Sequence, residues 1–379
     1  MGMLNKLYMA GCWVISLLLP VNKNKVVMSS YCGRGYSDNP KAVAEALREL
    51  DSHVEIVWLV KNEKEAATLP EGIIPCPFNS AKRIFALATA RVWVDNCRNY
   101  ARFKKKNQFY LQTWHGFPLK RIEKDAYVAL GEDYALGAVK DSKKTDLLLS
   151  NSRFATETLR RCYWYDGEIG EYGSPRNDVF FKPHPEIAGK IRAGLSLPAD
   201  RKVALYAPTF RADHSTHAYA IDAKGLAEAC EARFGGKWSV LIRLHPNVAG
   251  QAAGLFAYDG DTIVDATLYP DMQELLCGCD LLLTDYSSSM FDYALSGKPC
   301  IRFALDMEDY RKDRNFYFTQ EEMPFPVAES NAELVACVQG FDEVAYKETW
   351  NRFTQANGFF EDGEASKRCA RWILDKIKA

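Results

Sequence analysis

The stretch DLLLTDYSSSMFD, residues 280–292, decides the fold, because it joins an aliphatic run to a polar turn and then to an amphipathic segment. The aliphatic run at residues 280–284 has the length of a strand that is buried on both faces. Residues 289–295, which follow, have the apolar spacing that is typical of a helix. A strand followed at once by a helix is the repeating unit of α/β proteins with parallel sheets.

Similar strand–helix units recur along the chain in two successive series. In the first series, strands are expected at residues 25–29, 53–60, 91–95, 108–114 and 146–150, and helices at 39–50 and 80–90. In the second series, strands are expected at residues 202–206, 239–244, 262–265, 280–284 and 300–304, and helices at 226–234, 271–277 and 289–295. The fold class is therefore α/β, with two doubly wound, Rossmann-like domains. The length of 379 residues agrees, since a domain has roughly 100–200 residues.

The domain boundaries follow from the two series. Pro183, Pro185 and Pro198 punctuate the stretch between them, which we interpret as a linker. We expect an apolar N-terminal segment at residues 1–22, a first domain at 23–185, a second domain at 195–345 and C-terminal helices at 346–379.

The composition is that of an ordinary globular protein. With 47% hydrophobic and 26% charged residues, it excludes a disordered or collagen-like chain. The net charge of -1 hides an asymmetry, because residues 1–190 carry 28 Lys and Arg against 21 Asp and Glu, whereas residues 191–379 carry 20 against 28. A basic first half suits an anionic acceptor or membrane surface, but scattered surface charge explains it equally well. The 11 cysteines form no CxxC pair, which is typical of thiols in a reducing compartment.

The segment at residues 7–22 carries no charge, but it is shorter than the about 20 apolar residues that span a bilayer. Tyr8 and Trp13 suit a helix that lies in the membrane interface. A first helix buried against the domain and a cleaved signal peptide are the alternatives.

A basic cluster formed by Arg98, Arg102 and residues 104–106 suits anionic lipid or a polyphosphate acceptor. The alternative is an ordinary solvated face. Tyr100 and Phe103 lie between these cations and could stack on bases, but we expect no nucleic-acid partner.

Candidate catalytic residues of the first domain follow the predicted strands, where ligands bind in doubly wound sheets. His115 comes directly after the strand at residues 108–114, and Gly116 beside it permits a close backbone approach. A histidine can take up a proton near neutral pH, so His115 is a candidate general base. Asn96 follows the strand at residues 91–95 and is expected to support the same site.

Candidate phosphate ligands of the second domain also follow strands. Arg243 and His245 are two residues apart, so an extended backbone places them on one face. Thr209 and Arg211 add a hydroxyl and a guanidinium after the strand at residues 202–206. Cationic groups and hydroxyls in such positions suit a phosphate.

The serine loop at residues 287–289 is the strongest candidate. Ser287 and Ser288 precede a predicted helix, whose free N–H groups would form a phosphate cradle together with their hydroxyls. These serines could instead be ordinary helix caps, and Asp285 is expected to anchor the loop. The sequence contains no P-loop and no complete dinucleotide fingerprint, and it places no acidic pair on a strand-exit loop. We therefore predict no cofactor and no metal.

Six ordered motifs together resemble the CDP-glycerol glycerophosphotransferase family of teichoic-acid and capsule-polymer synthesis. They are YSDNPK at 36–41, WHG at 114–116 with PLK at 118–120, GSPRND at 173–178, YAPTFR at 206–211, RLHP at 243–246, and TDYSS at 284–288 with FD at 291–292. Arg314 stands where the family carries a further arginine. The resemblance covers about residues 25–330.

The resemblance implies a fold similar to the GT-B glycosyltransferases, with two Rossmann-like domains facing a cleft and the last helices crossing back to the first domain. It implies that the second domain binds CDP-glycerol and that the first receives a lipid-linked or polymeric phosphate acceptor. A peripheral enzyme on the cytoplasmic face of the bacterial membrane would fit this role.

In the mechanism that the resemblance implies, an acceptor hydroxyl attacks the phosphorus next to glycerol, and CMP leaves. His115 would take the proton, and His245, Arg211, Arg243 and Arg314 would stabilise the diphosphate. A CDP-ribitol-dependent transferase, a GT-B glycosyltransferase that uses a nucleotide sugar, and a non-catalytic binding protein are the alternatives.

Overall fold

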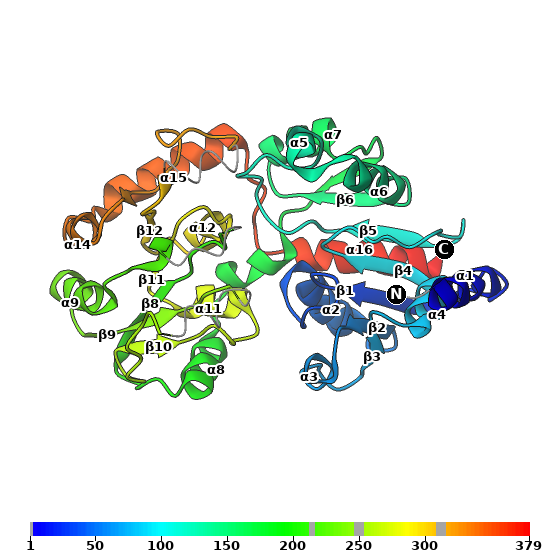
Figure 1. The fold of residues 1–379 in the computed structure, drawn as a ribbon, viewed down its shortest axis with the longest axis horizontal. Helices are drawn as coiled ribbons and strands as arrows, with labels where there is room; N and C mark the ends of the chain where they lie inside the picture. Colours follow the sequence, from blue (N-terminus) through cyan, green and yellow to red (C-terminus); the bar gives the residue numbers. More distant parts are fainter. Residues whose placement is uncertain (1–2, 212–216, 246–253, 308–315) are drawn as a thin grey trace. The chain divides into compact units, whose positions relative to one another are not determined.

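The computed structural model describes residues 3–211, 217–245, 254–307 and 316–379. The chain forms two compact units (Figure 1). The first unit comprises Met1–Gly116, Ile122–Asp178 and Phe359–Ala379, and the second comprises Phe117–Arg121 and Val179–Gly358. The chain therefore leaves the first unit after Gly116 and returns at Ile122, and it leaves again after Asp178 and returns at Phe359 for its last helix.

The first unit is built on a parallel sheet with the strand order β3-β2-β1-β4-β5-β6-β7. Its strands are β1 (Asn22–Ser29), β2 (Glu55–Val60), β3 (Ile73–Pro77), β4 (Ala90–Asp95), β5 (Phe109–Gln112), β6 (Leu147–Ser150) and β7 (Glu168–Glu171). Its helices are α1 (Met3–Ser16), α2 (Asp38–Leu50), α3 (Glu63–Ala66), α4 (Ala81–Thr89), α5 (Tyr127–Leu130), α6 (Glu132–Ser142), α7 (Arg153–Cys162) and α16 (Ala365–Lys378). The central strand β4 is buried along its whole length, as expected for a parallel sheet covered on both faces.

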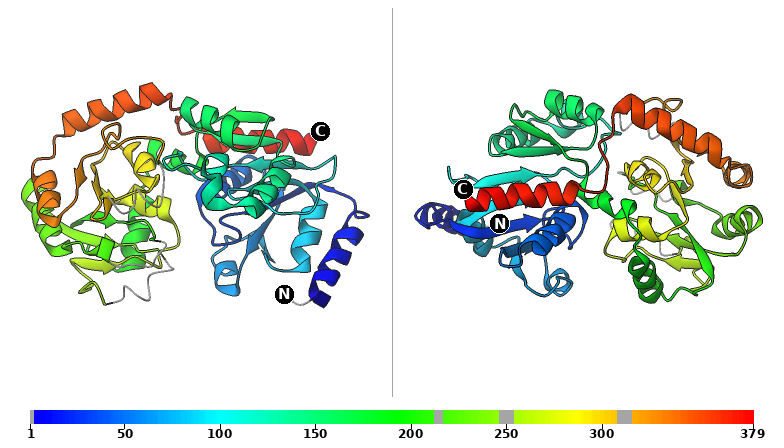
Figure 2. Two further views of the ribbon diagram at one scale, coloured as in Figure 1. Left: turned by 45° about the horizontal axis from the view of Figure 1, so that its top comes forward. Right: turned by 180° about the vertical axis from the view of Figure 1, so that it is seen from behind.

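Helix α16 completes the core of the first unit. It packs against α2, and Figure 2 shows it lying along the sheet of this unit. Cys369, Ala370 and Ile373 of α16 are buried together with side chains of β1, β2 and β4. The last helix is thus part of the core that it joins.

The second unit is built on a parallel sheet with the strand order β10-β9-β8-β11-β12-β13. Its strands are β8 (Arg201–Tyr206), β9 (Lys237–Ile242), β10 (Ile263–Asp265), β11 (Leu281–Thr284), β12 (Cys300–Phe303) and β13 (Val327–Ala328). Its helices are α8 (Pro185–Leu195), α9 (Ala223–Phe234), α11 (Met272–Gly278), α12 (Ser289–Ala294), α14 (Asn331–Gln339) and α15 (Glu343–Asn357).

Each sheet has a point at which the strand order reverses. This switch point lies between β1 and β4 in the first unit and between β8 and β11 in the second. In doubly wound folds, ligands bind beyond the carboxyl ends of the strands at such a point. The segments that follow β1 and β4, and those that follow β8 and β11, are therefore where each unit is expected to bind.

The proline-containing stretch that we interpreted as a linker contains a helix, α8, which packs against α11 of the second unit. The helix begins at Pro185. Proline fits the first turn of a helix, where its missing N–H would have had no helical partner. Pro185 therefore marks the start of helix α8, in the stretch that we had interpreted as a linker between domains.

Helix α1 packs against α4 and buries Cys12 and Trp13, while Tyr8, Val14 and the following Leu18 are exposed. One face of α1 is therefore buried against its unit, and the opposite face leaves apolar side chains exposed. Among the helices of the described residues, none has both the length and the apolar character required to cross a bilayer.

Arg98 does not belong to an exposed basic cluster. Its guanidinium is buried, where it donates to Glu123 Oε2 over 2.6 Å and to Ser142 Oγ over 2.7 Å. Its side chain also lies over the ring of Tyr163. The surface cations of this segment are Arg102 and Lys106.

Candidate active site

His115 stands at the exit of β5, where its ring is fixed by backbone contacts. Its Nδ1 lies 2.7 Å from the carbonyl oxygen of Asn96, at the exit of β4. A carbonyl can only accept a hydrogen bond, so Nδ1 carries the proton, and Nε2 of the neutral ring keeps its lone pair. Burial lowers the pKa of His115, although the Asn96 carbonyl and the charge of Asp38 act in the opposite direction. The ring is therefore neutral at physiological pH and able to accept a proton at Nε2.

A buried ion pair holds the backbone around His115. Arg176 donates to Asp38 Oδ2 over 2.6 Å and to the carbonyl oxygen of His115 over 2.9 Å. Asp38 Oδ1 accepts from the side-chain amide of Asn96 over 2.9 Å. Burial favours the neutral form of Asp38, but Arg176 and hydrogen bonds from its neighbours hold the pKa of this carboxyl below its usual value. Asp38 is therefore charged and links Arg176 to the residue that orients His115.

Tyr31 and Asn39 complete this network at the exit of β1. The Tyr31 hydroxyl donates to Asp38 Oδ2 over 2.6 Å, and its backbone N–H donates to Asn96 Oδ1 over 2.8 Å. Asn39 donates to the carbonyl oxygen of Trp114 over 2.9 Å and accepts from the backbone N–H of Arg176 over 3.0 Å. These residues are positioning residues, since each acts on the loop that carries His115. Sequence reasoning quoted the motifs that contain Asp38, Asn39 and Arg176 but assigned these residues no role.

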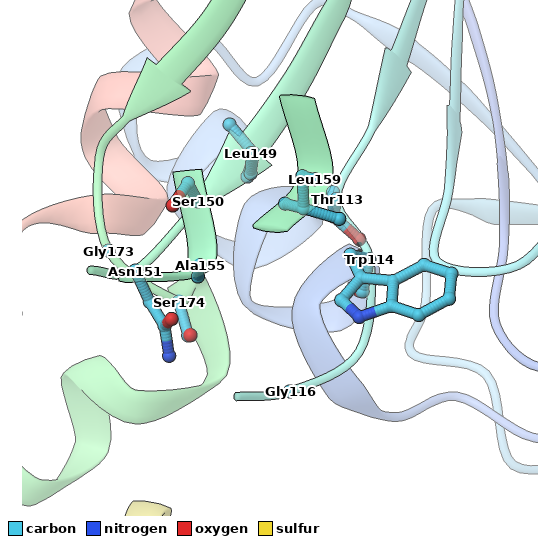
Figure 3. Close-up of a pocket in the computed structure, with 10 residues that line it drawn as sticks. All are labelled: Thr113, Trp114, Gly116, Leu149, Ser150, Asn151, Ala155, Leu159, Gly173 and Ser174. Carbon is cyan, nitrogen blue, oxygen red and sulfur yellow. Dashed lines mark hydrogen bonds between the residues drawn. The ribbon is translucent and has the colours of Figure 1, made fainter. Parts of the chain in front are cut away.

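A crevice opens beside this network at the carboxyl ends of β5, β6 and β7 (Figure 3). It holds about 240 Å³ of empty space that continues into solvent. The ten residues that line it belong to the first unit and are Thr113, Trp114, Gly116, Leu149, Ser150, Asn151, Ala155, Leu159, Gly173 and Ser174. We call it the β5–β7 crevice.

In the second unit, Arg211 joins the exits of three strands. It donates to Asp285 Oδ2 over 2.7 Å and to Asp306 through two bonds of 2.5 and 2.9 Å. Burial alone would lower the pKa of Arg211, but the two carboxylates raise it overall. In the described contacts, Arg211 links the loops that follow β8, β11 and β12. Sequence reasoning missed Asp306, which follows β12.

Asp285 anchors the serine loop to the loop that follows β8. Its Oδ1 accepts from the backbone N–H groups of Thr209 and Tyr286, over 2.8 and 2.6 Å. The buried hydroxyl of Thr209 has no hydrogen-bond partner among the described residues. A donor that is buried and unpaired at a switch point is suited to a ligand oxygen.

The hydroxyls of the serine loop differ in their contacts. Ser287 Oγ accepts from the backbone N–H of Ser289, the first residue of α12, over 3.3 Å. Ser289 donates through its hydroxyl to Ser287 Oγ over 2.9 Å. Ser288 occupies the cap position of α12 without a capping hydrogen bond from its side chain. The alternative of ordinary helix caps therefore does not describe Ser288.

Arg243 and His245 follow β9. The Arg243 side chain donates to the carbonyl oxygen of Tyr269, and the ring of His245 lies 5.2 Å from that of Phe210. Both side chains are partly exposed. Arg314 lies outside the described residues. Across the described ranges, no group of three or more His, Cys, Asp or Glu side chains is arranged to hold a metal ion.

Comparison with known proteins gives the family. The model of the CDP-glycerol:poly(glycerophosphate) glycerophosphotransferase family matches residues 12–375. The chain belongs to this family. Its match to the teichoic acid poly(glycerol phosphate) polymerase of Staphylococcus epidermidis has 33% identity over 94% of this chain and 51% of the polymerase. This glycerophosphotransferase-family chain thus spans about half the length of that relative.

Two further matches cover nearly all of both chains. The teichoic acid glycerol-phosphate transferase of Staphylococcus aureus is 33% identical over 93% of each chain. The structure of the wall teichoic acid polymerase TagF has a TM-score of 0.87 and 31% identity, and the match covers 98% of this chain and 94% of that one. The expected α/β, GT-B-like fold of this family member is confirmed.

Proposed function

We propose that the protein transfers glycerol phosphate from CDP-glycerol to a hydroxyl of a lipid-linked or polymeric acceptor and releases CMP. The observation that carries this proposal is a neutral, oriented His115 after β5, in a chain that belongs to the glycerophosphotransferase family. A solved TagF structure was soaked with CDPG, and it covers 100% of this chain and 99% of that one at 30% identity.

The first unit receives the acceptor, and His115 is the general base. The acceptor oxygen forms a bond to the phosphorus next to glycerol, while its proton passes to Nε2 of His115. The bond from that phosphorus to the bridging oxygen breaks, and its electron pair leaves with CMP. Phosphoryl transfer depends mainly on positioning and charge stabilisation, so a single base contributes about 10²–10⁴-fold.

The second unit binds the diphosphate of the donor. Donors are supplied by the hydroxyl of Thr209, which is unpaired among the described residues, by the hydroxyl of Ser288, which makes no capping bond, and by the partly exposed Arg243 and His245. Arg211 and Asp285 hold these loops in place. Charged donors fixed before substrate binds stabilise developing negative charge without reorganising.

The deciding experiment follows CMP release from CDP-glycerol, CDP-ribitol and a UDP-sugar in the presence of lipid-linked glycerol-phosphate acceptors. CMP release with CDP-glycerol is expected to exceed that with CDP-ribitol, and no nucleoside diphosphate is expected from the UDP-sugar. A preference for CDP-ribitol or release of a nucleoside diphosphate would contradict the proposal.

The variant His115→Ala separates catalysis from donor binding. It is expected to lose about 10²-fold or more in CMP release while CDP-glycerol binding in calorimetry stays unchanged. His53→Ala, on the exposed turn before β2, is the matched control and should keep full activity. Loss of donor binding by His115→Ala, with turnover retained, would remove His115 from the role of base.

We also propose that α1 docks the enzyme on an anionic membrane surface, which fits an acceptor carried by lipid. The ring centroid of Trp13 in α1 lies 4.9 Å from that of Phe103, and Lys105 donates to the carbonyl oxygen of Leu19. Helix α1 therefore lies next to the segment that carries Arg102 and Lys106. Leu18 is 86% exposed beside α1. Apolar side chains next to cations are the features that bind anionic bilayers.

Co-sedimentation with phosphatidylglycerol-containing vesicles tests this docking. Binding is expected to fall with rising salt and to be lost in Leu18→Glu. Leu136→Glu changes a leucine of the same unit that is 53% exposed on α6, and it should bind as the unchanged protein does. Equal binding of both variants would exclude α1 as the docking surface.

A further inference from the structure

Two polar side chains of the β5–β7 crevice are nearly buried and yet have no protein partner. Asn151 is 5% exposed and Ser174 is 6% exposed. In the part of the chain that the structure describes, neither the Asn151 amide nor the Ser174 hydroxyl makes a hydrogen bond to another side chain or to the backbone. Figure 3 shows both on the wall of the crevice opposite Trp114. Because both groups line an open crevice and are not used by the protein itself, they are available to a ligand that enters it.

The backbone fixes these side chains before any ligand arrives. The Asn151 carbonyl accepts from the N–H of Phe360 over 2.9 Å, and the Ser174 N–H donates to Glu361 Oε2 over 3.0 Å. Gly173 between them has a φ of +87°, and a Cβ there would lie 2.9 Å from Glu361 Oε2. The segment before α16 thus fixes the backbone of the wall that carries Asn151 and Ser174, as a preorganised site requires.

The lining also specifies the chemistry of the ligand. None of the ten lining residues is charged, and the aliphatic side chains of Leu149, Ala155 and Leu159 lie among the polar ones. Among the described residues, no cation lines the crevice to bind a phosphate. A neutral polyol, in contrast, could bind the amide of Asn151, the hydroxyl of Ser174 and the indole ring of Trp114. The crevice is open to solvent on one side, so it suits the end of a chain that reaches in from outside.

The crevice adjoins the candidate base. Trp114 lines it, and the Trp114 and His115 rings are 4.3 Å apart. We propose that the β5–β7 crevice binds the terminal diol of a polyol-phosphate acceptor, with Asn151 and Ser174 holding the hydroxyl next to the one that reacts. This inference rests on the proposed function, because it names the part of the acceptor that the first unit recognises.

The test compares two acceptors that share the reacting primary alcohol. Butyl glyceryl phosphate carries a neighbouring secondary hydroxyl, and butyl 3-hydroxypropyl phosphate lacks it. The unchanged enzyme is expected to prefer the glyceryl acceptor by about tenfold in kcat/KM for CMP release, the value of one hydrogen bond. Asn151→Ala and Ser174→Ala are expected to bring this ratio close to one and to leave the KM for CDP-glycerol unchanged. Asn351→Ala, on the exposed face of α15, is the matched control and should keep the preference.

The outcomes separate this inference from the proposed function. If CMP is released but the preference is absent, or persists in both variants, the crevice is not the diol site. If no acceptor yields CMP, the proposed function fails, and calorimetry of the two butyl phosphates without donor decides the crevice alone. Tighter binding of the glyceryl compound that Asn151→Ala or Ser174→Ala abolishes would then support it, and equal binding of both compounds would overturn it.

Discussion

Replacing Arg176 by methionine would leave Asp38 buried with its charge but without its cation. Both side chains are about 6% exposed, and the pair is 2.6 Å long. Breaking a buried ion pair costs about 3–5 kcal/mol. Asp38 would keep donors from Tyr31, Asn96 and the Asn39 backbone, so we expect the lower value, about 3 kcal/mol in the free energy of unfolding. For a unit of this size, that loss lowers the melting temperature by roughly 6–12 °C.

The pH dependence gives this prediction its sign. In the unchanged protein, the pKa of Asp38 is lowered, so its contribution to stability is present above its ordinary value and is lost as the pH falls below it. Without Arg176, burial, which raises the pKa of Asp38, dominates, and the carboxyl takes up a proton at a higher pH. The stability deficit of Arg176→Met should therefore shrink between pH 7 and pH 5.

Urea unfolding followed by circular dichroism at both pH values measures this deficit. Arg34→Met, at an exposed position of the same unit, is the matched control and should change stability by less than about 0.5 kcal/mol. Adding Asp38→Asn to Arg176→Met should recover part of the loss, because it removes the unpaired charge. A deficit below about 1 kcal/mol at pH 7, or one that grows on acidification, would refute the reasoning.

Two further predictions concern the chain on either side of Gly116. Because burial lowers the pKa of His115, kcat/KM for CMP release should rise with pH through a value below the ordinary 6.5 or so and then level off; a midpoint above that value in a pH–rate profile would contradict the role of base. Phe117 is 2% exposed with its ring 4.5 Å from Phe291, so Phe117→Ala should lower the free energy of unfolding by about 3–5 kcal/mol in urea titration. Phe181→Ala, at a site 40% exposed, should cost much less, and equal losses would contradict the packing argument.

The interior strands of both sheets could be predicted from sequence, whereas three of the four edge strands could not. The five strands expected in each series were found, with bounds that differ by a few residues. The missed strands β3, β7 and β13 all lie at sheet edges. An edge strand is paired on one side only and can contain prolines, as β3 does, so it lacks the continuous apolar run of an interior strand.

The candidate site was predictable where a residue follows its own strand. His115, Asn96, Asp285 and Thr209 were found in this way, and their places beyond strand ends agree with the structure. Asp38 and Arg176 bond across 138 positions of the chain, so no local pattern could assign them as a pair. The same holds for Asp306, which binds Arg211 across 95 positions.

The sequence by itself determined that the chain alternates buried strands with helices and that polar side chains follow those strands. The reason is that the spacing of apolar residues within a short stretch depends on the local backbone geometry. The tertiary structure alone decided the strand order, and hence which polar loops meet at each switch point. It also decided that Asn151 and Ser174, from the exits of two neighbouring strands, line one crevice. These arrangements depend on the free energy of contacts between segments that are far apart in the chain, and no single stretch of sequence reveals those contacts.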